Sequence, residues 1–225
     1  KVFVSVLDEG LPLLDVQQPE LMLRPPADVL SQVSALAIGP GLGASSTAQA
    51  LVHEAVATRL PLLLDADALN TVAATTALRE ALATRGAPTV LTPHPAEAAR
   101  LLDSDAASVQ ADRLAAAREL ATRYRAHVVV KGCGSVIATP DGTPCINASG
   151  HAGLASAGTG DVLSGLCVAL LAQHWPAREA LLAAVHLHGA AADLLAANDY
   201  GPIGLTAGEL ADAARAVFNG WCQQR

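Results

Sequence analysis

Short aliphatic runs alternate along this chain with longer segments rich in Ala and Leu. The short runs are typical of buried parallel strands, and the longer segments are typical of the helices that connect them. The alternation therefore predicts an α/β fold. We expect strands at residues 2–7, 35–38, 61–64, 89–91, 128–131, 135–138 and 144–147. We expect helices at residues 46–58, 76–84, 96–102, 111–124, 160–173, 177–197 and 207–218.

The 225 residues are expected to form a single domain, which at this size buries roughly 70% of the unfolded chain's surface. The proline-rich stretch 18–26 and the turn at 198–202 are predicted to be surface loops, because neither separates two segments large enough to form a core. The sequence opens without Met, directly in the first predicted strand, so we expect that an upstream portion is missing.

The composition excludes several classes of protein. Hydrophobic residues make up 52% of the chain, which is too many for a disordered protein. The longest apolar stretch, 162–172, is shorter than the roughly 20 residues that span a bilayer, so no membrane segment is predicted. Four cysteines without CxxC spacing indicate neither a zinc module nor a disulfide framework, and they favour a reducing, cytoplasmic location.

Charge argues against a nucleic-acid partner. The formal net charge is −7, and the 14 Lys and Arg residues are scattered along the chain, whereas binding to a phosphate backbone requires basic clusters. A net negative charge does not exclude local phosphate binding, which needs only backbone amides and a lysine.

The strongest local motif is the segment Gly158-Thr159-Gly160-Asp161, which leads directly into an apolar helix. Glycines at a helix start let backbone N–H groups converge on an anion, where the helix dipole adds positive charge. Asp161 is then a candidate base for a hydroxyl that attacks a bound phosphoryl group, although the same field would weaken it as a base. The alternative is that Thr159 caps the helix and Asp161 only complements its dipole.

Other polar residues follow predicted strands. Gly39-Pro40-Gly41-Leu42-Gly43 lies where open α/β sheets bind ligands, although a tight strand-to-helix turn has the same pattern. In the segment 64–70, Asp65 and Asp67 end another strand; for Asp65 we favour a helix cap. His94, between two prolines, has a restricted geometry and is either structural or functional.

The lysine turn 131–135 fits either a nucleotide phosphate or a β-hairpin. His186 and His188 have HxH spacing, but residues two apart on a helix point in different directions. We therefore predict helix packing for this pair, and no metal site.

Six motifs occur in order, and together they resemble the NAD(P)H-hydrate dehydratase family over about residues 2–217. They are GPGLG from Gly39, LDADALN from Leu64, TPHPAEAARLL from Thr92, VVVKGCGS from Val128, GHAGLASAGTGDVLSG from Gly150 and HGAAAD from His188. The resemblance implies a ribokinase-like fold, a three-layer αβα sandwich with a central, mostly parallel sheet.

The resemblance also implies a metabolite-repair reaction, in which (6S)-NADHX or NADPHX is converted back to NADH or NADPH at the expense of ADP or ATP. The C6 hydroxyl would be phosphorylated and phosphate then eliminated. Asp161 would activate the hydroxyl, and the amides of Gly158, Thr159 and Gly160 would stabilise the transferring phosphoryl group together with Mg²⁺.

Carried over by position, Gly43 and His94 would contact the hydrated dinucleotide, with Asp67 and Asn70 nearby. The adenine nucleotide would be held by Lys131, Gly132, Cys133, Gly134, Ser135 and Gly160. Family members often form homotetramers, and some carry an NAD(P)H-hydrate epimerase domain.

Two departures from the family pattern stand out. His151 takes the place of a usual Asn, and the family's N-terminal strand and helix, with a Gly-rich segment, are missing here. Two other interpretations stay open: a ribokinase-like kinase of a vitamin precursor, which would share the GTGD motif, and a nucleotide-binding module without catalysis.

Overall fold

A six-stranded sheet forms the centre of the computed structural model, which describes residues 1–7 and 14–223. The spatial order of the strands is the same as their order in the chain, and the first four are parallel. The last two join antiparallel as successive hairpins. The strands are β3 (Leu36–Ile38), β4 (Leu62–Leu64), β5 (Thr89–Leu91), β6 (His127–Val130), β7 (Val136–Ala138) and β8 (Cys145–Ile146).

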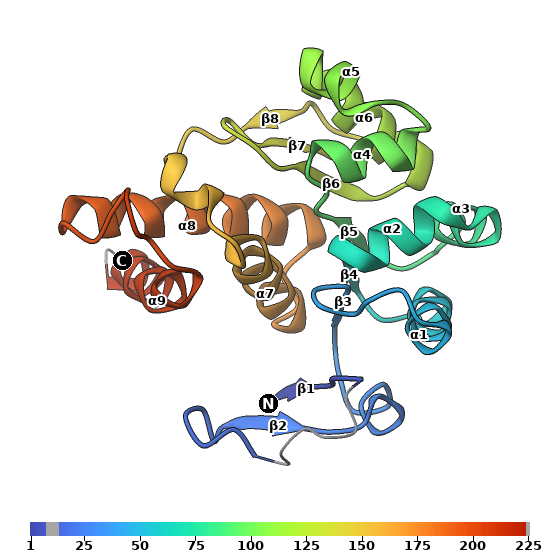
Figure 1. Ribbon diagram of the computed structural model, residues 1–225, viewed down its shortest axis with the longest axis horizontal. Helices are drawn as coiled ribbons and strands as arrows, with labels where there is room; N and C mark the ends of the chain where they lie inside the picture. Colours follow the sequence, from blue (N-terminus) through green and yellow to red (C-terminus); the bar gives the residue numbers. More distant parts are fainter. Residues whose placement is uncertain (8–13, 224–225) are drawn as a thin grey trace.

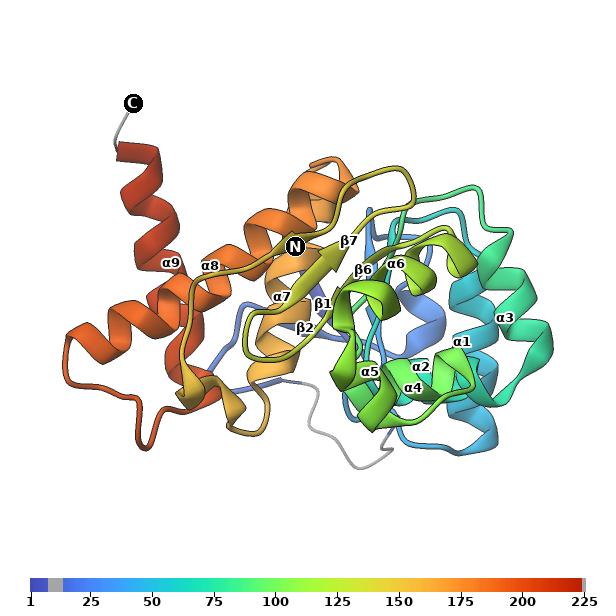
Figure 2. The ribbon, with the colours of Figure 1, turned by 90° about the horizontal axis from the view of Figure 1, so that it is seen from above.

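Helices cover both faces of this sheet (Figures 1 and 2). Successive residues of a strand point to opposite faces. Leu62 and Leu64 accordingly pack into one core cluster, and Leu63 packs into the other. The first cluster lies under α1 (Ser46–Ala57), α2 (Ala66–Ala74), α3 (Thr76–Ala83), α4 (Pro95–Leu102), α5 (Ala106–Ala111) and α6 (Arg113–Tyr124). The second lies under α7 (Thr159–Ala172) and α8 (Ala177–Ala197), and α9 (Ala207–Gln223) packs on α8. The predicted three-layer α/β architecture is confirmed.

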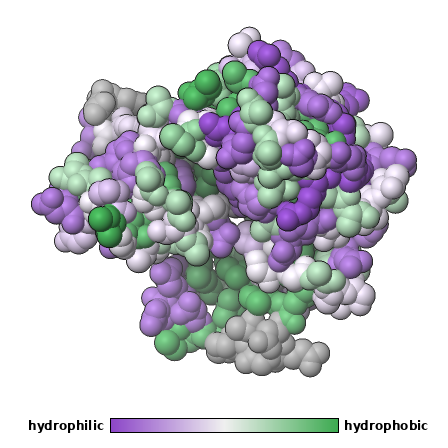
Figure 3. Space-filling model, turned by 45° about the horizontal axis from the view of Figure 1, so that its top comes forward, coloured by the Kyte–Doolittle hydropathy of each residue, from purple (hydrophilic) through white to green (hydrophobic). Residues whose placement is uncertain are grey.

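A separate pair of parallel strands, β1 (Val2–Val4) and β2 (Leu21–Leu23), lies apart from the main sheet (Figure 1). The prediction that 18–26 is only a loop was wrong, because three apolar residues between its prolines pair with β1. Figure 3 shows hydrophobic surface gathered at this end of the molecule. Exposed apolar side chains here include Val2, Val6, Leu14 and Val16.

Two helices, α2 and α5, lie outside the predicted helix ranges, although the cap favoured for Asp65 implies a helix after it. In α2, Ala66 has a left-handed φ of 47° directly after the capping Asp65. In α5 the capping residue is Asp105. The predicted helix 111–124 starts two residues later, at Arg113, because the Asp112 side chain accepts a hydrogen bond from the Ala115 amide and starts α6 there.

Helix α8 is the one helix of the described residues that is long and apolar enough to cross a membrane. It packs against α7 and α9 and against the sheet at β5 and β6. Ten of its residues are buried. We therefore assign α8 to the protein core, where its predicted bounds are confirmed.

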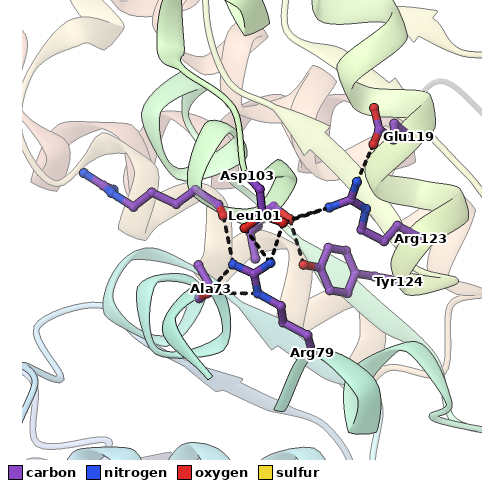
Figure 4. A network of polar contacts seen from close by, with 8 residues as sticks. Ala73, Arg79, Leu101, Asp103, Glu119, Arg123 and Tyr124 are labelled. Atoms are coloured by element: carbon purple, nitrogen blue, oxygen red, sulfur yellow. Dashed lines mark hydrogen bonds and ion pairs between the residues drawn. The ribbon is translucent and has the colours of Figure 1, made fainter. Parts of the chain in front are cut away.

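Side chains tie the helices of one layer together (Figure 4). Arg79 of α3 pairs with Asp103 at 2.7 Å and donates to the Ala73 carbonyl of α2. The buried Tyr124 hydroxyl of α6 donates to the Leu101 carbonyl of α4 at 2.9 Å. These bonds fix α2 and α4, whose N-termini lie at the carboxyl ends of β4 and β5.

Candidate active site

The turn before α7 is shaped by glycine. Gly158 caps the helix with a left-handed φ of 81°, a conformation that side chains disfavour. The Thr159 hydroxyl donates to the Leu154 and Ser156 carbonyls at 2.7 and 2.9 Å, so the alternative that Thr159 caps α7 is wrong. The first two amides of α7, those of Thr159 and Gly160, have no carbonyl partner one turn earlier among the described residues, whereas the Asp161 amide donates to the Gly158 carbonyl at 3.1 Å. All three residues line a cavity of about 790 Å³.

Lys131 at the end of β6 reaches the same turn. Its Nζ lies 3.3 Å from the point where a Cβ would stand on Gly160, so a larger residue there would crowd the ammonium. The turn that follows, residues 131–135, connects the antiparallel β6 and β7, as the hairpin alternative predicted. All five of its residues also line the cavity.

Asp65 is the functional-site residue that the sequence interpretation underestimated. The cap is confirmed, because the Asp65 carboxylate accepts from the Ala66 amide at 2.9 Å. The same carboxylate also pairs with Lys131 Nζ at 2.8 Å and accepts from the Ser164 hydroxyl at 2.8 Å. The signal available in the sequence was an Asp and a Lys at the ends of two parallel strands, which meet at one edge of the sheet.

Asp161 stands in the first turn of α7 and is exposed on the cavity wall. Partial burial and, second, the negative charge of Asp65 raise the pKa of the Asp161 carboxyl, and Lys131 opposes them. The helix field was expected to weaken Asp161 as a base. Burial and the Asp65 charge act in the direction opposite to that field.

His94 is both a cap and a cavity residue. Its Nδ1 accepts from the amides of Ala96 and Glu97 at 3.1 and 3.4 Å, and the Glu97 carboxylate accepts from the His94 amide at 2.8 Å. This capping box fixes the start of α4. Because Nδ1 accepts, the ring proton is on Nε2, which lies 3.2 Å from Glu97. The ring lines the cavity.

Gly43, Asp67 and Asn70 do not line this cavity. The Gly43 amide donates to the Asp67 carboxylate at 2.8 Å, so the two predicted residues contact each other. Asn70 accepts from Arg100 at 2.9 Å. The structure thus brings together His94, the lysine turn and the GTGD turn, and it places these three residues beside them, at the starts of α1 and α2.

A sequence model of NAD(P)H-hydrate dehydratases matches residues 2–215 of the chain. The chain belongs to the NAD(P)H-hydrate dehydratase family. It is 44% identical to an ADP-dependent (S)-NAD(P)H-hydrate dehydratase of Neisseria meningitidis, over 97% of this chain and 75% of the relative. It is 39% identical to a bifunctional NAD(P)H-hydrate repair enzyme of Escherichia coli, over 97% of this chain but 42% of that longer protein.

Solved structures of this family and its neighbours have the same fold. The Bacillus subtilis ADP/ATP-dependent NAD(P)H-hydrate dehydratase, co-crystallised with ATP and Mg²⁺, superposes with a TM-score of 0.80 at 34% identity, over 91% of this chain and 75% of that one. A ribokinase-like superfamily protein of Enterococcus faecalis gives 0.77 at 27% identity, over 91% and 72%. The predicted family and its ribokinase-like fold are confirmed.

Within this dehydratase, His151 caps a short 3-10 helix, Ala152–Ala155. Its Nδ1 accepts from the Gly153 amide at 3.0 Å, and its Nε2 donates to the Ala192 carbonyl of α8 at 2.9 Å. An Asn side chain also has one acceptor and one donor group. His151 is therefore accommodated as a cap at the cavity edge.

The two histidines of α8, His186 and His188, make contacts in different directions, as predicted. His188 Nε2 donates to the Thr159 carbonyl at 2.9 Å, and burial lowers the pKa of this imidazole. His186 stacks on Trp221 with ring centroids 5.6 Å apart. His188 thus supports the GTGD turn of the dehydratase from behind.

Magnesium finds few protein ligands here. The described residues contain no group of three or more His, Cys, Asp or Glu side chains that could hold a metal. The carboxylates of Asp65 and Glu97 are already engaged by Lys131, Ser164 and His94. Mg²⁺ commonly binds through phosphates and water, and so does not require such a group of side chains.

Proposed function

We propose that this chain catalyses the ADP-dependent dehydration of (6S)-NADHX and (6S)-NADPHX, which restores NADH and NADPH. The observation that carries the proposal is the placement of Asp161. Asp161 lies on the wall of a large cavity, in the first turn of α7, and Thr159 and Gly160, which carry the first two amides of this helix, line the same cavity. A base beside an anion site is the arrangement that phosphorylation of a hydroxyl requires.

The reaction has two steps. Asp161 accepts the proton of the C6 hydroxyl while that oxygen attacks the terminal phosphorus of ADP, and the bond to the AMP oxygen breaks. Amides of Gly158, Thr159 and Gly160 donate to the transferring phosphoryl oxygens. The phosphate then leaves C6 with its bonding electrons, and loss of a proton from C5 forms the C5–C6 double bond. The hydrate and ADP are thereby converted to NAD(P)H, AMP and phosphate.

The remaining site residues are assigned to two substrates. The turn that contains Lys131, Gly132, Cys133, Gly134 and Ser135 binds the nucleotide together with Gly160. His94 contacts the hydrated dinucleotide within the cavity, and Gly43, Asp67 and Asn70 contact it beyond the cavity rim. Support for this division is that the lysine turn and the GTGD turn meet at Lys131 and Gly160.

A cytoplasmic location and a homotetramer are part of the proposal. All four cysteines are free, which supports a reducing compartment. Light scattering on the purified protein tests the tetramer. Bifunctional repair enzymes among the relatives support an epimerase as partner, either as a fused domain or as a separate protein.

The test is an incubation of the protein with NADHX and MgADP, in which the return of NADH is followed by its absorbance. Asp161→Asn is expected to lower the rate by roughly a hundredfold or more, because an amide accepts no proton. Asp105→Asn, a carboxylate that caps the remote α5, is the control. A stable phosphate ester as product would identify a small-molecule kinase instead. ADP binding without turnover would identify a binding module.

A further inference from the structure

The chain uses lysine very sparingly. It contains twelve arginines but two lysines, one of which is residue 1. Lys131 is therefore the one lysine after residue 1. An ammonium is a compact point charge, and its contact with phosphate does not fix a plane as a guanidinium does. The direction in which Lys131 points must come from its neighbours.

Two carboxylates lie near this ammonium. Asp65 holds Nζ at 2.8 Å. Asp161 is the second: it follows Gly160, whose Cβ position would lie 3.3 Å from Nζ, and the charge of Lys131 lowers its pKa, although no ion pair joins the two in the described residues. An ammonium that turned to Asp161 would stabilise the ionised carboxylate and reduce its strength as a base. It would also leave the phosphate site.

Asp65 is held in place to bind the Lys131 ammonium. Its side chain is 1% exposed and accepts hydrogen bonds from three elements: the Ala66 amide of α2, Lys131 beyond β6 and the Ser164 hydroxyl of α7. Its own backbone is also fixed, because its amide donates to the Ile38 carbonyl of β3. A buried carboxylate with these partners has little freedom to move.

We propose that Asp65 is a positioning residue, whose buried carboxylate holds the Lys131 ammonium at the GTGD turn, so that it meets the nucleotide phosphate and leaves Asp161 free. The inference rests on the proposed function, because it assigns a task within that site. Asp65 lines the cavity but is only 1% exposed, and its carboxylate is already engaged by three donors, so we assign it no contact with substrate. It acts through Lys131, and through its charge on Asp161.

Other titratable groups around Asp161 are engaged elsewhere. From α8, His188 is buried and donates to the Thr159 carbonyl. From α4, His94 and Glu97 satisfy each other in the capping box. At the cavity edge, His151 is held between the Gly153 amide and the Ala192 carbonyl. Partial burial raises the pKa of Asp161 most, and Asp65 and Lys131 are the charged groups that act on it besides.

The test compares kinetics and pH profiles of Asp65→Asn with the wild type. We expect kcat to fall about tenfold or more and the KM for ADP to rise. The acid limb of the kcat profile should move to lower pH, because removing the Asp65 charge lowers the pKa of Asp161. Asp105→Asn also loses an N-cap aspartate, and it should leave kcat and the limb unchanged.

A second readout needs no turnover. Acylation of Lys131 by an amine reagent, followed by mass spectrometry, is expected to be several-fold faster in Asp65→Asn, because the ammonium loses its partner. ADP should slow the acylation in the wild type. If wild-type protein binds ADP at Lys131 but returns no NADH, the proposed function fails while the positioning role is still judged on this rate.

A double-mutant cycle covers the case in which Asp65→Asn does not fold. Lys131→Met strands a buried carboxylate, whereas the double variant removes both charges and should be the more stable of the two. On the plateau of the kcat profile, above the acid limb where Asp161 is ionised in every variant, Asp65 acts only through Lys131, and adding Asp65→Asn to Lys131→Met changes kcat by less than about twofold. A further drop of tenfold would overturn the proposal. So would an Asp65→Asn protein with the wild-type acid limb and acylation rate.

Discussion

Two glycines of one turn make a matched pair for testing the geometry of the site. Gly39 and Gly41 both have positive φ, 131° and 64°, but their surroundings differ. A Cβ on Gly39 would stand 1.8 Å from the Asp65 carbonyl oxygen and 3.0 Å from Ala68 Cβ. A Cβ on Gly41 would have no atom within 4 Å. Both alanine variants are therefore strained in the backbone, Gly39→Ala at least as much as Gly41→Ala, and only Gly39→Ala adds steric overlap.

The magnitudes follow from that difference. Gly41→Ala incurs the left-handed strain alone, about 1–2 kcal/mol. Gly39→Ala adds an overlap with backbone that cannot rotate away, which costs another 1–3 kcal/mol or more, about 2–5 kcal/mol in all. For a chain of this size each kcal/mol lowers Tm by roughly 2–4 °C. We expect a Tm loss of about 5–20 °C for Gly39→Ala and less than about 8 °C for Gly41→Ala.

The assay is thermal unfolding followed by circular dichroism, together with the NADH-recovery rate. A Cβ at position 39 would displace the Asp65 backbone. At a temperature where the Gly39→Ala protein is still folded, its NADH-recovery rate should therefore be lower than that of the wild type. Gly41→Ala should retain the rate of the wild type when folded. Equal Tm losses for the two variants would refute the reasoning, because the close approach of Gly39 to Asp65 would then have no energetic consequence.

Three further outcomes are expected. Tyr124→Phe should lower the free energy of unfolding by about 0.5–1.5 kcal/mol in urea titrations, because it deletes the buried bond to the Leu101 carbonyl. A thiol reagent should label three exposed cysteines quickly and Cys167 only on unfolding, since burial raises the pKa of Cys167 to about 12. The free energy of unfolding should fall as pH drops below about 6.5, where His188 is protonated in the unfolded chain but not in its buried site, and His188→Gln should reduce that slope.

Much of the fold was predictable because the strands carry an unambiguous signal. The runs that became β3 to β7 are mainly aliphatic, and those of β4 to β7 are buried almost throughout while β3 is half-buried, so each run could be recognised as a strand from local sequence. β2 was not predictable in this way. Its three residues lie among prolines, and what makes them a strand is the pairing with β1, a contact that local sequence does not encode.

In the site, too, the features set by local sequence were predictable and those set by contacts between distant residues were not. The GTGD turn and the lysine turn were predictable, because glycine spacing and strand ends are local features. Asp65 was predicted as a cap from local sequence, and the cap is there. Its bonds to Lys131 and Ser164 span 66 and 99 residues, so they depend on which strand ends and which helix meet in space. Local sequence therefore predicted the helix cap by Asp65 but not its bonds to Lys131 and Ser164.

Asp161 has two demands to meet, since it lies at a helix N-terminus that binds anions and is also the proposed base. A carboxylate in the first turn of a helix is stabilised in its ionised form, which favours anion binding nearby but disfavours proton transfer. Here partial burial and, second, the Asp65 charge act in the direction opposite to that field. If Asp65 holds Lys131 as proposed, the same turn can bind an anion and carry a base, because the carboxylate that contributes to the raised pKa of Asp161 also pairs with the lysine.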